Sequence, residues 1–181
     1  QAAFKRKHIL MLGSLKLYKS PLEFIELTKR LPQFIFVLVI NDTKENINIF
    51  IKEYKINISK NLTIYPQQND VVPFYNQTSL VLNLSNKKQF VETFGLTALE
   101  AMSAGLPVIV PTEGGIAEMV VDGENGYKID VQNLNQIAEC IKTILSDETL
   151  YMELAQNALA YSKRFSEAKM VNSIEMILNR K

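Results

Sequence analysis

Cysteine, histidine and long apolar runs are scarce in this sequence, and each scarcity excludes a class of protein. With Cys140 as its single cysteine, the chain can form no internal disulfide, which suits a reducing compartment. We expect Cys140 to pack on the apolar face of a helix. His8 is the single histidine and has no cysteine beside it, so neither a metal site nor a general base is expected there. No apolar run reaches the ~18 residues of a membrane-spanning helix, so no transmembrane segment is predicted.

An excess of charge of one sign is also missing. The sequence has 20 basic and 19 acidic residues, for a net charge of +1, so bulk charge does not favour binding to nucleic acid. Hydrophobic residues make up 47% and charged residues 22% of the chain, which is typical of a globular protein rather than a disordered one. Its 181 residues suit one domain. Because the chain begins with Gln1 rather than Met, we expect a fragment of a longer protein.

Short apolar runs alternate with helical patterns along the whole chain. The runs predict strands at residues 8–12, 34–40, 62–65, 80–84, 108–110 and 127–129. Helices are predicted at residues 21–31, 44–54, 70–76, 96–104, 115–120, 134–145, 150–165 and 168–178. Ser20 to Glu23 is typical of a capping box, and Gly105 suits a left-handed helix end. Alternating strands and helices predict a Rossmann-like, doubly wound α/β fold with a parallel sheet of about six strands.

The segment from Gln89 to Pro111 organises the rest of the chain. Glu92 and Glu100 stand on either side of a turn, Phe94-Gly95-Leu96, that begins a helix. The free N–H groups at such a helix start favour an anion, for example a phosphate. Carboxylates would repel the anion but can accept hydrogen bonds from the hydroxyls of a ribose or a hexose. The segment therefore predicts a pocket for a sugar phosphate or a nucleotide sugar.

The same segment resembles a known enzyme family. The run E-T-F-G-L-T-A-L-E-A-M-S-A-G-L-P-V-I, followed by G-G-I-A-E-M-V-V-D-G-E-N-G-Y, is similar to the donor-binding half of a retaining GT-B glycosyltransferase. The resembling enzymes are those of family 4, or group 1, including capsule and lipopolysaccharide mannosyl-, glucosyl- and galactosyltransferases. The resemblance implies that residues 1–165 form a Rossmann-like nucleotide-sugar donor domain, one half of a GT-B fold. It also implies that residues 166–181 form a C-terminal helix that crosses back to a missing N-terminal domain.

The first loop carries one matching and one differing residue. The family pattern G-R-x4-K-G aligns with Gly13 to Ser20, so Lys19 is implied as the cation on the leaving diphosphate. Read without the resemblance, Lys19 is a solvated surface lysine. Ser14 occupies the place of the family arginine and supplies no charge. Either Lys16 or another basic residue compensates, or the donor is bound more weakly and activity is impaired.

The resemblance assigns further residues to the donor. Glu92 is implied to contact the hydroxyls of the transferred sugar and, with Lys19, to be catalytic, while Glu100 contacts the ribose hydroxyls. The full set of implied donor-binding residues is Gly13, Ser14, Lys19, Tyr65, Pro66, Glu92, Thr93, Phe94, Gly95, Leu96 and Glu100. Both glutamates could instead be helix-cap or solvent-facing carboxylates, and Tyr65, implied to flank the base, could be a core residue. Gly114-Gly115 and Glu118 are interpreted as fold-forming turns near the pocket.

The implied activity is transfer of a hexose from a nucleotide diphosphate sugar to a polysaccharide or lipid-linked acceptor. The acceptor would bind through the missing N-terminal domain, so we expect this fragment to be inactive alone. No metal or cofactor, no nucleic-acid partner and a cytoplasmic location are expected, with any peripheral contact to the inner membrane face made by the missing domain. Two alternatives stay open. One is a nucleotide-sugar-binding regulatory module or half-enzyme with a separate partner chain. The other is a UDP-sugar epimerase, which would be expected to carry extra acid–base histidines and carboxylates that this chain lacks.

Overall fold

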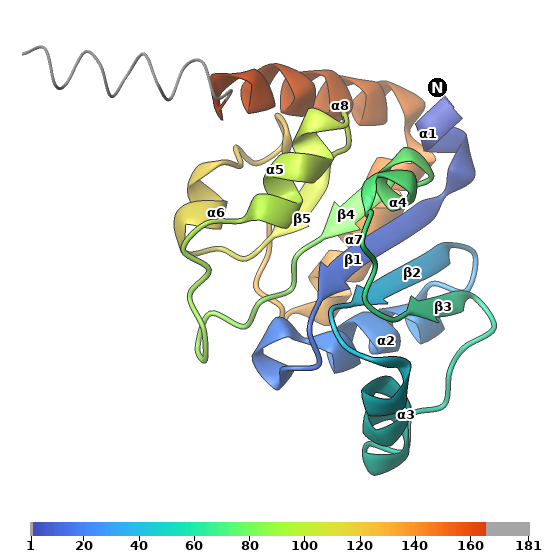
Figure 1. The fold of residues 1–181 in the computed structure, drawn as a ribbon. Coiled ribbons are helices and arrows are strands. Elements are labelled where there is room, and N and C mark those ends of the chain that lie inside the picture. The colour runs from blue at the N-terminus through green and yellow to red at the C-terminus, as the bar shows by residue number, and fades with distance from the viewer. Residues whose placement is uncertain (1, 166–181) are drawn as a thin grey trace, which may run out of the picture.

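Six parallel strands form one sheet in the computed structural model, which describes residues 2–165 (Figure 1). The strands are β1 (His8–Gly13), β2 (Ile35–Ile40), β3 (Leu62–Tyr65), β4 (Leu80–Leu82), β5 (Val108–Val110) and β6 (Gly126–Lys128). They lie in the order β3-β2-β1-β4-β5-β6, so the winding direction switches between β1 and β4. This order is that of a Rossmann-like sheet, and the predicted fold class is confirmed.

Eight α-helices and two 3₁₀ turns accompany the strands within residues 2–165. The helices are α1 (Ala2–Arg6), α2 (Pro21–Arg30), α3 (Lys44–Glu53), α4 (Val72–Asn76), α5 (Leu96–Ser103), α6 (Gly115–Glu118), α7 (Leu134–Ser146) and α8 (Glu148–Ser162). The 3₁₀ turns are η1 (Leu17–Lys19) and η2 (Lys163–Phe165). Sequence patterns did not predict α1, and the predicted helix at residues 168–178 and the crossing-back of residues 166–181 lie outside the described residues.

The two faces of the sheet form two separate apolar layers. Neighbouring residues of a strand point to opposite faces, so Ile9 of β1 joins one layer and Leu10 the other. The layer of Ile9 includes side chains of α2 and α7, and the layer of Leu10 includes side chains of α4, α5 and α6. Burial on both faces explains why the strands read as continuous apolar runs in the sequence.

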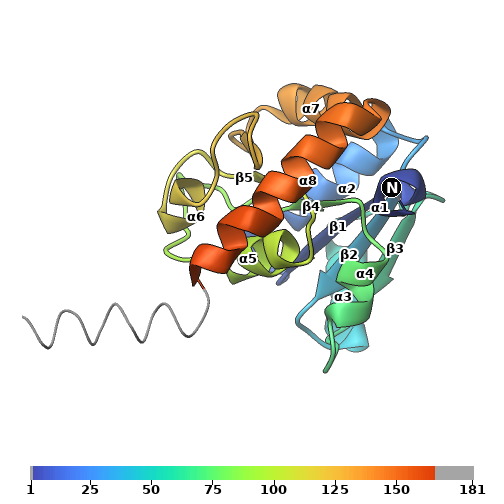
Figure 2. The ribbon, with the colours of Figure 1, turned by 90° about the horizontal axis from the view of Figure 1, so that it is seen from above.

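Helix α8 joins the two layers. It packs against both α5 and α7 and lies between them when the molecule is seen from above (Figure 2). Tyr151 and Leu154 belong to one apolar layer, whereas Ala158, one turn further on, belongs to the other. None of the helices within residues 2–165 is long and apolar enough to cross a membrane.

Two predicted helix boundaries are confirmed by backbone geometry. Gly105 adopts a left-handed φ of +70° directly after the C-cap of α5. Thr43 caps α3, because its side chain accepts a hydrogen bond from the N–H of Asn46 at 3.2 Å.

The capping box predicted at Ser20 is wrong. Ser20 adopts a left-handed backbone (φ 57°, ψ 46°), because the 3₁₀ turn η1 ends immediately before it, and its side chain caps nothing. Its hydroxyl is fully buried and has no hydrogen-bond partner within the described residues. A left-handed backbone favours glycine, which is the residue that the family pattern has at this position.

Ser20→Gly is therefore expected to stabilise the fold. A left-handed backbone costs a residue with a side chain roughly 1–2 kcal/mol, and a buried unpaired hydroxyl adds to this. The greater freedom of glycine in the unfolded chain offsets about 0.5–1 kcal/mol. We expect a net gain of about 1 kcal/mol, seen as a rise of about 3 °C in the midpoint of thermal unfolding. Lys55→Gly is the control for the backbone contribution, since Lys55 is exposed with a φ of 50°; a fall in midpoint for Ser20→Gly would refute the explanation.

Candidate functional site

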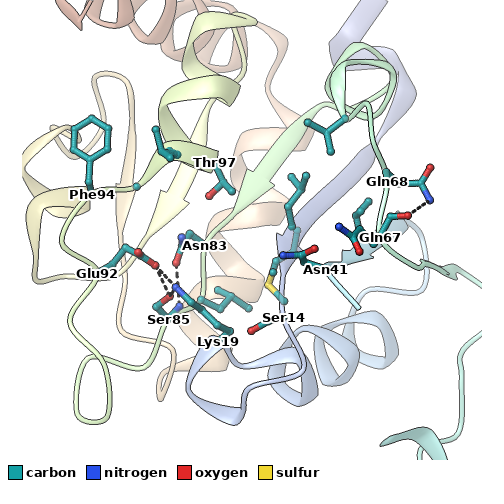
Figure 3. A pocket seen from close by; sticks show the side chains of 18 residues that line it. Ser14, Lys19, Asn41, Gln67, Gln68, Asn83, Ser85, Glu92, Phe94 and Thr97 are labelled. Atoms are coloured by element: carbon teal, nitrogen blue, oxygen red, sulfur yellow. Dashed lines mark hydrogen bonds and ion pairs between the residues drawn. The ribbon is translucent and has the colours of Figure 1, made fainter. Parts of the chain in front are cut away.

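A cavity of about 400 Å³ opens at the carboxyl ends of the strands, beside the point where the winding direction switches (Figure 3). Its walls come from the loops after β1, β2, β3 and β4 and from the first turn of α5. Ligands of open α/β sheets bind in this place because loops diverge there and helix N-termini point inward.

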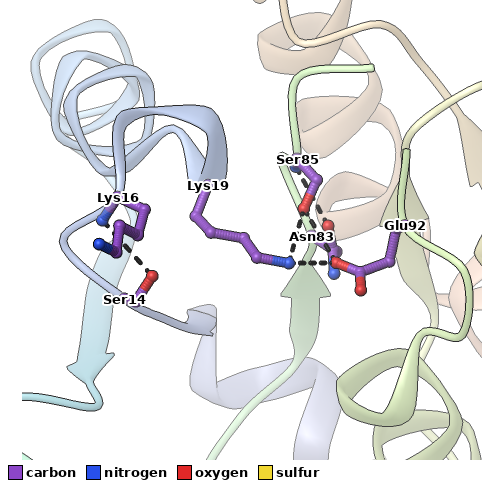
Figure 4. A network of polar contacts seen from close by, with 6 residues as sticks. All are labelled: Ser14, Lys16, Lys19, Asn83, Ser85 and Glu92. Carbon is purple, nitrogen blue, oxygen red and sulfur yellow. Dashed lines mark hydrogen bonds and ion pairs between the residues drawn. The ribbon is translucent and has the colours of Figure 1, made fainter. Parts of the chain in front are cut away.

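Lys19, Ser85 and Glu92 form a polar network on one side of the cavity (Figures 3 and 4). The ammonium group of Lys19 forms an ion pair with the carboxylate of Glu92. The hydroxyl of Ser85, itself buried, lies 3.4 Å from the Lys19 ammonium and donates to Glu92 Oε2 at 3.1 Å. The two side chains implied to be catalytic, 73 positions apart in sequence, therefore meet in the folded chain.

The position of Lys19 is fixed by contacts between η1 and the loop after β4. The N–H of Asn86 donates to the carbonyl of Tyr18 at 2.7 Å, and the rings of Tyr18 and Phe90 stack at 4.9 Å. The Lys19 ammonium lies 4.5 Å from the centre of the Phe90 ring, within the range of a cation–π interaction. Aromatic contacts and the ion pair thus hold this cation at the cavity.

The Gly114-Gly115 pair supports the segment that carries Glu92. A Cβ at Gly114 would lie 2.3 Å from the carbonyl oxygen of Glu92, and one at Gly115 would lie 2.0 Å from that of Thr93. Gly114 also has a left-handed φ of +95°. Only a residue without a side chain allows the two backbones to pass this closely, so the glycines have the fold-forming role that the sequence indicated.

Gly115→Ala is expected to lower the free energy of unfolding by about 2 kcal/mol, since backbone must move to admit the methyl group. Urea-induced unfolding measures this change. Gly13→Ala is the matched control, because a Cβ there meets nothing closer than 4.0 Å. Equal stability of the two variants would contradict the close approach of the backbones.

Amide side chains line the other side of the cavity, and sequence patterns did not single them out. Asn41 follows β2, and Gln67 and Gln68 follow β3 (Figure 3). The N–H of Gln67 donates to the carbonyl of Asp42 at 2.9 Å, which ties the two loops together. Amides supply both donors and acceptors, as the edge of a nucleobase requires. Their place directly after predicted strands is the signal that could have identified them.

The cavity brings together most of the predicted donor-binding residues. Those that line it are Gly13, Ser14, Lys19, Glu92, Phe94, Gly95 and Leu96, whereas Tyr65, Pro66, Thr93 and Glu100 do not. Tyr65 is partly exposed and packs edge-on against Phe74 at 5.0 Å, next to the lining residues Gln67 and Gln68. Glu100 lies one helical turn after the lining residue Thr97 and accepts a hydrogen bond from Tyr75 at 2.6 Å.

The start of α5 brings backbone donors to the cavity. Gly95 is its N-cap, and the first helical hydrogen bond runs from the N–H of Leu99 to the carbonyl of Gly95. The N–H of Leu96 donates to the carbonyl of Phe94 at 3.2 Å, whereas the N–H groups of Thr97 and Ala98 precede the first helical bond, have no helical acceptor and are suited to an anion. A Cβ at Gly95 would lie 2.3 Å from the buried Ile116 side chain, so glycine allows α5 to start this close to α6.

Lys19 and Glu92 are the only charged side chains among the described residues that line the cavity, so its formal charge is zero. Ser14 contributes a hydroxyl in place of the family arginine. Lys16 is exposed on the same loop and lies apart from the network of Lys19 (Figure 4). Its backbone N–H lies 3.4 Å from the Ser14 hydroxyl.

His8 and Cys140 lie away from this site. His8 begins β1 at the end of the sheet opposite the cavity, and burial lowers its pKa. Cys140 packs against an apolar layer, and its pKa is raised to about 12, first by burial and then by the charge of Asp122. The position of Cys140 is explained by packing, as the sequence predicted. Within residues 2–165, no group of His, Cys, Asp and Glu side chains is arranged to hold a metal ion.

Residues 2–161 match the family described as glycosyl transferases group 1. The chain belongs to this family. It is 30% identical over 142 residues to the N-acetyl-alpha-D-glucosaminyl L-malate synthase of Bacillus anthracis, covering 78% of this chain and 36% of that protein. An uncharacterized glycosyltransferase of Methanocaldococcus jannaschii is 36% identical over 86 residues, which are 48% of this chain and 24% of that protein. The chain therefore spans about a third or less of these relatives.

Solved structures share the fold. The HepE protein of Anabaena, solved with UDP, superimposes with a TM-score of 0.82 at 22% identity, over 96% of this chain and 49% of that chain. The C-terminal domain of the group 1 glycosyl transferase LpcC of Francisella tularensis superimposes with a TM-score of 0.71 at 26% identity, over 87% of this chain and 85% of that domain. The group 1 domain described here thus has the fold of a GT-B C-terminal domain, as the sequence predicted.

Proposed function

We propose that this domain binds the nucleotide diphosphate sugar donor of a group 1 glycosyltransferase. The observation that supports this most directly is the meeting of Lys19 and Glu92 in a cavity that also contains the first turn of α5. A cation and free backbone N–H groups suit a diphosphate, and a carboxylate suits sugar hydroxyls. HepE, which shares the fold, was solved with UDP and with UDP-glucose, which supports a nucleotide sugar as the ligand of this domain.

In this proposal, the diphosphate lies between Lys19 and the start of α5, and the hexose lies beside Glu92. The base lies toward Asn41, Gln67 and Gln68 on the other side of the cavity (Figure 3). When the bond from the sugar to the diphosphate breaks, its electron pair goes to the diphosphate oxygen, where Lys19 stabilises the developing charge. The acceptor oxygen attacks from the same face, which retains the configuration, and its proton passes to the leaving diphosphate.

The acceptor, a polysaccharide or lipid-linked sugar of the kind used in capsule or lipopolysaccharide synthesis, would bind to an N-terminal domain. The side chains of Phe94 and Leu96 are exposed apolar groups at the cavity, and they suit contact with such a domain. The domain described here is then a donor-binding half that does not transfer sugar alone. Sugar transfer by this chain, measured with radiolabelled donors, would refute that part of the proposal.

Isothermal titration calorimetry with UDP, GDP and ADP and their glucose and mannose forms tests the proposed function. We expect one nucleotide class to bind and the others to bind at least tenfold more weakly. No heat of binding with any of them at millimolar concentration would refute a donor site in this domain. Binding of all three classes with equal affinity would refute the assignment of the amide-lined side to the base.

A further inference from the structure

Tyr75 and Glu100 are joined by a hydrogen bond, next to the cavity-lining residue Thr97. The Tyr75 hydroxyl donates to Glu100 Oε2 at 2.6 Å and lies 3.3 Å from the carbonyl oxygen of Thr97. Tyr75 is on α4 and Glu100 is on α5, and both helices cover the same face of the sheet (Figures 1 and 2). The bond therefore connects the two helices that follow β3 and β4.

Both ends of this bond are close to cavity-lining residues. Thr97 lines the cavity and stands three positions before Glu100, which places both on one side of α5. Val71 also lines the cavity and is the N-cap of α4, one turn before Tyr75. The carboxylate of Glu100 therefore lies one helical turn from the cavity wall, within reach of a ligand that extends along α5.

The two partners differ in exposure: Tyr75 is buried and fixed by packing, whereas Glu100 is exposed. The Tyr75 side chain is 5% exposed and packs in the apolar layer with Ala98 and Met102, so its ring cannot move freely. Glu100 is exposed and, as a glutamate on a helix surface, would otherwise sample several rotamers. Burial, followed by the hydrogen bond to Glu100, raises the pKa of Tyr75. The tyrosine thus stays a proton donor that fixes one carboxylate oxygen.

We propose that Tyr75 is a positioning residue that holds Glu100 ready to accept hydrogen bonds from the ribose hydroxyls of the donor. This inference rests on the proposed function, in which the ribose lies between the diphosphate and the base. With Oε2 bound to Tyr75, Oε1 is the oxygen directed to the ligand, and its orientation is set before the donor arrives. Fixing the rotamer in advance removes an entropy loss from binding and should increase affinity.

The test compares each of UDP, GDP and ADP with its 2′,3′-dideoxy form, by calorimetry on wild type, Tyr75→Phe, Glu100→Ala and the double variant. We expect wild type to prefer the ribose form at least tenfold, and Tyr75→Phe to lose most of this preference. The dideoxy forms should bind Tyr75→Phe and wild type equally. The double variant should be no weaker than Glu100→Ala.

Tyr151→Phe is the matched control, since Tyr151 is equally buried and its hydroxyl has no partner within residues 2–165. It should leave every affinity unchanged. If Tyr75→Phe weakens ribose and dideoxy forms equally, Tyr75 only supports the fold, and the inference is wrong. The inference also fails if Tyr75→Phe keeps the full preference, or if wild type binds both forms equally. Binding of no nucleotide at all would overturn the proposed function together with the inference.

Discussion

Replacing Lys19 with alanine is expected to weaken strongly the binding of the nucleoside diphosphate that the wild-type domain selects. Lys19 is the only cation among the described residues that line the cavity. A charge-assisted hydrogen bond contributes about 1.5–3 kcal/mol. Its loss also leaves Glu92 unpaired beside the diphosphate, which adds repulsion. We expect the dissociation constant, measured by calorimetry with UDP, GDP and ADP, to rise by about 100-fold.

Two variants separate this effect from a general change in charge. Lys29→Ala removes the same charge from an ion pair with Glu26 on α2 and should leave affinity unchanged. Lys16→Ala tests whether the exposed lysine of the same loop compensates for Ser14. A loss of affinity less than about threefold for Lys19→Ala would contradict a diphosphate at this position.

Replacing Glu92 with glutamine should change the affinities for nucleotide and nucleotide sugar in opposite directions. In the free domain, Glu92 and the diphosphate compete for the Lys19 ammonium, because the carboxylate holds it in an ion pair. Without the negative charge, Lys19 is free and repulsion of the diphosphate falls. At the effective dielectric of a partly buried site, these two changes together should make the free energy of nucleotide binding about 1 kcal/mol more favourable. UDP, or the nucleotide selected, should therefore bind about fivefold more tightly.

The same variant should lose its preference for the sugar-bearing donor. A glutamine accepts hydrogen bonds from hydroxyls more weakly than a carboxylate does. The ratio of affinities for UDP-glucose and UDP should therefore fall about tenfold. Glu113→Gln is the control, since Glu113 forms an ion pair with Lys87 and does not line the cavity. Equal weakening of both ligands by Glu92→Gln would mean that Glu92 only orders the site.

The fold could be predicted because its signals are local. Apolar strands buried on both faces appear as continuous runs, as at Ile35–Ile40, and helix boundaries have their own residues, such as Gly105. The capping prediction at Ser20 was wrong because the capping pattern is local, whereas the backbone of Ser20 is set by the preceding 3₁₀ turn. The five-residue helix α1 carries too short a pattern to be detected.

The site was predictable only in part, for a physical reason. Lys19 and Glu92 belong to motifs that can be read along the chain, and the cavity brings them together. Asn41 and Gln67 line the same cavity because β2 and β3 are neighbours in the sheet, and no short sequence pattern predicts that strand order. The bond from Tyr75 to Glu100 joins positions 25 residues apart on two helices, so it depends on how those helices pack.

NMR can show whether the cavity at the carboxyl ends of the strands binds the donor nucleotide. Spectra of the ¹⁵N-labelled domain would be recorded during titration with UDP, GDP and ADP. We expect amide shifts to gather at residues 13–19, 67–68 and 92–97. Shifts confined instead to the second cavity of about 220 Å³ beside α8, at Val121, Asn157 and Arg164, would contradict the account, and so would spectra that no nucleotide changes.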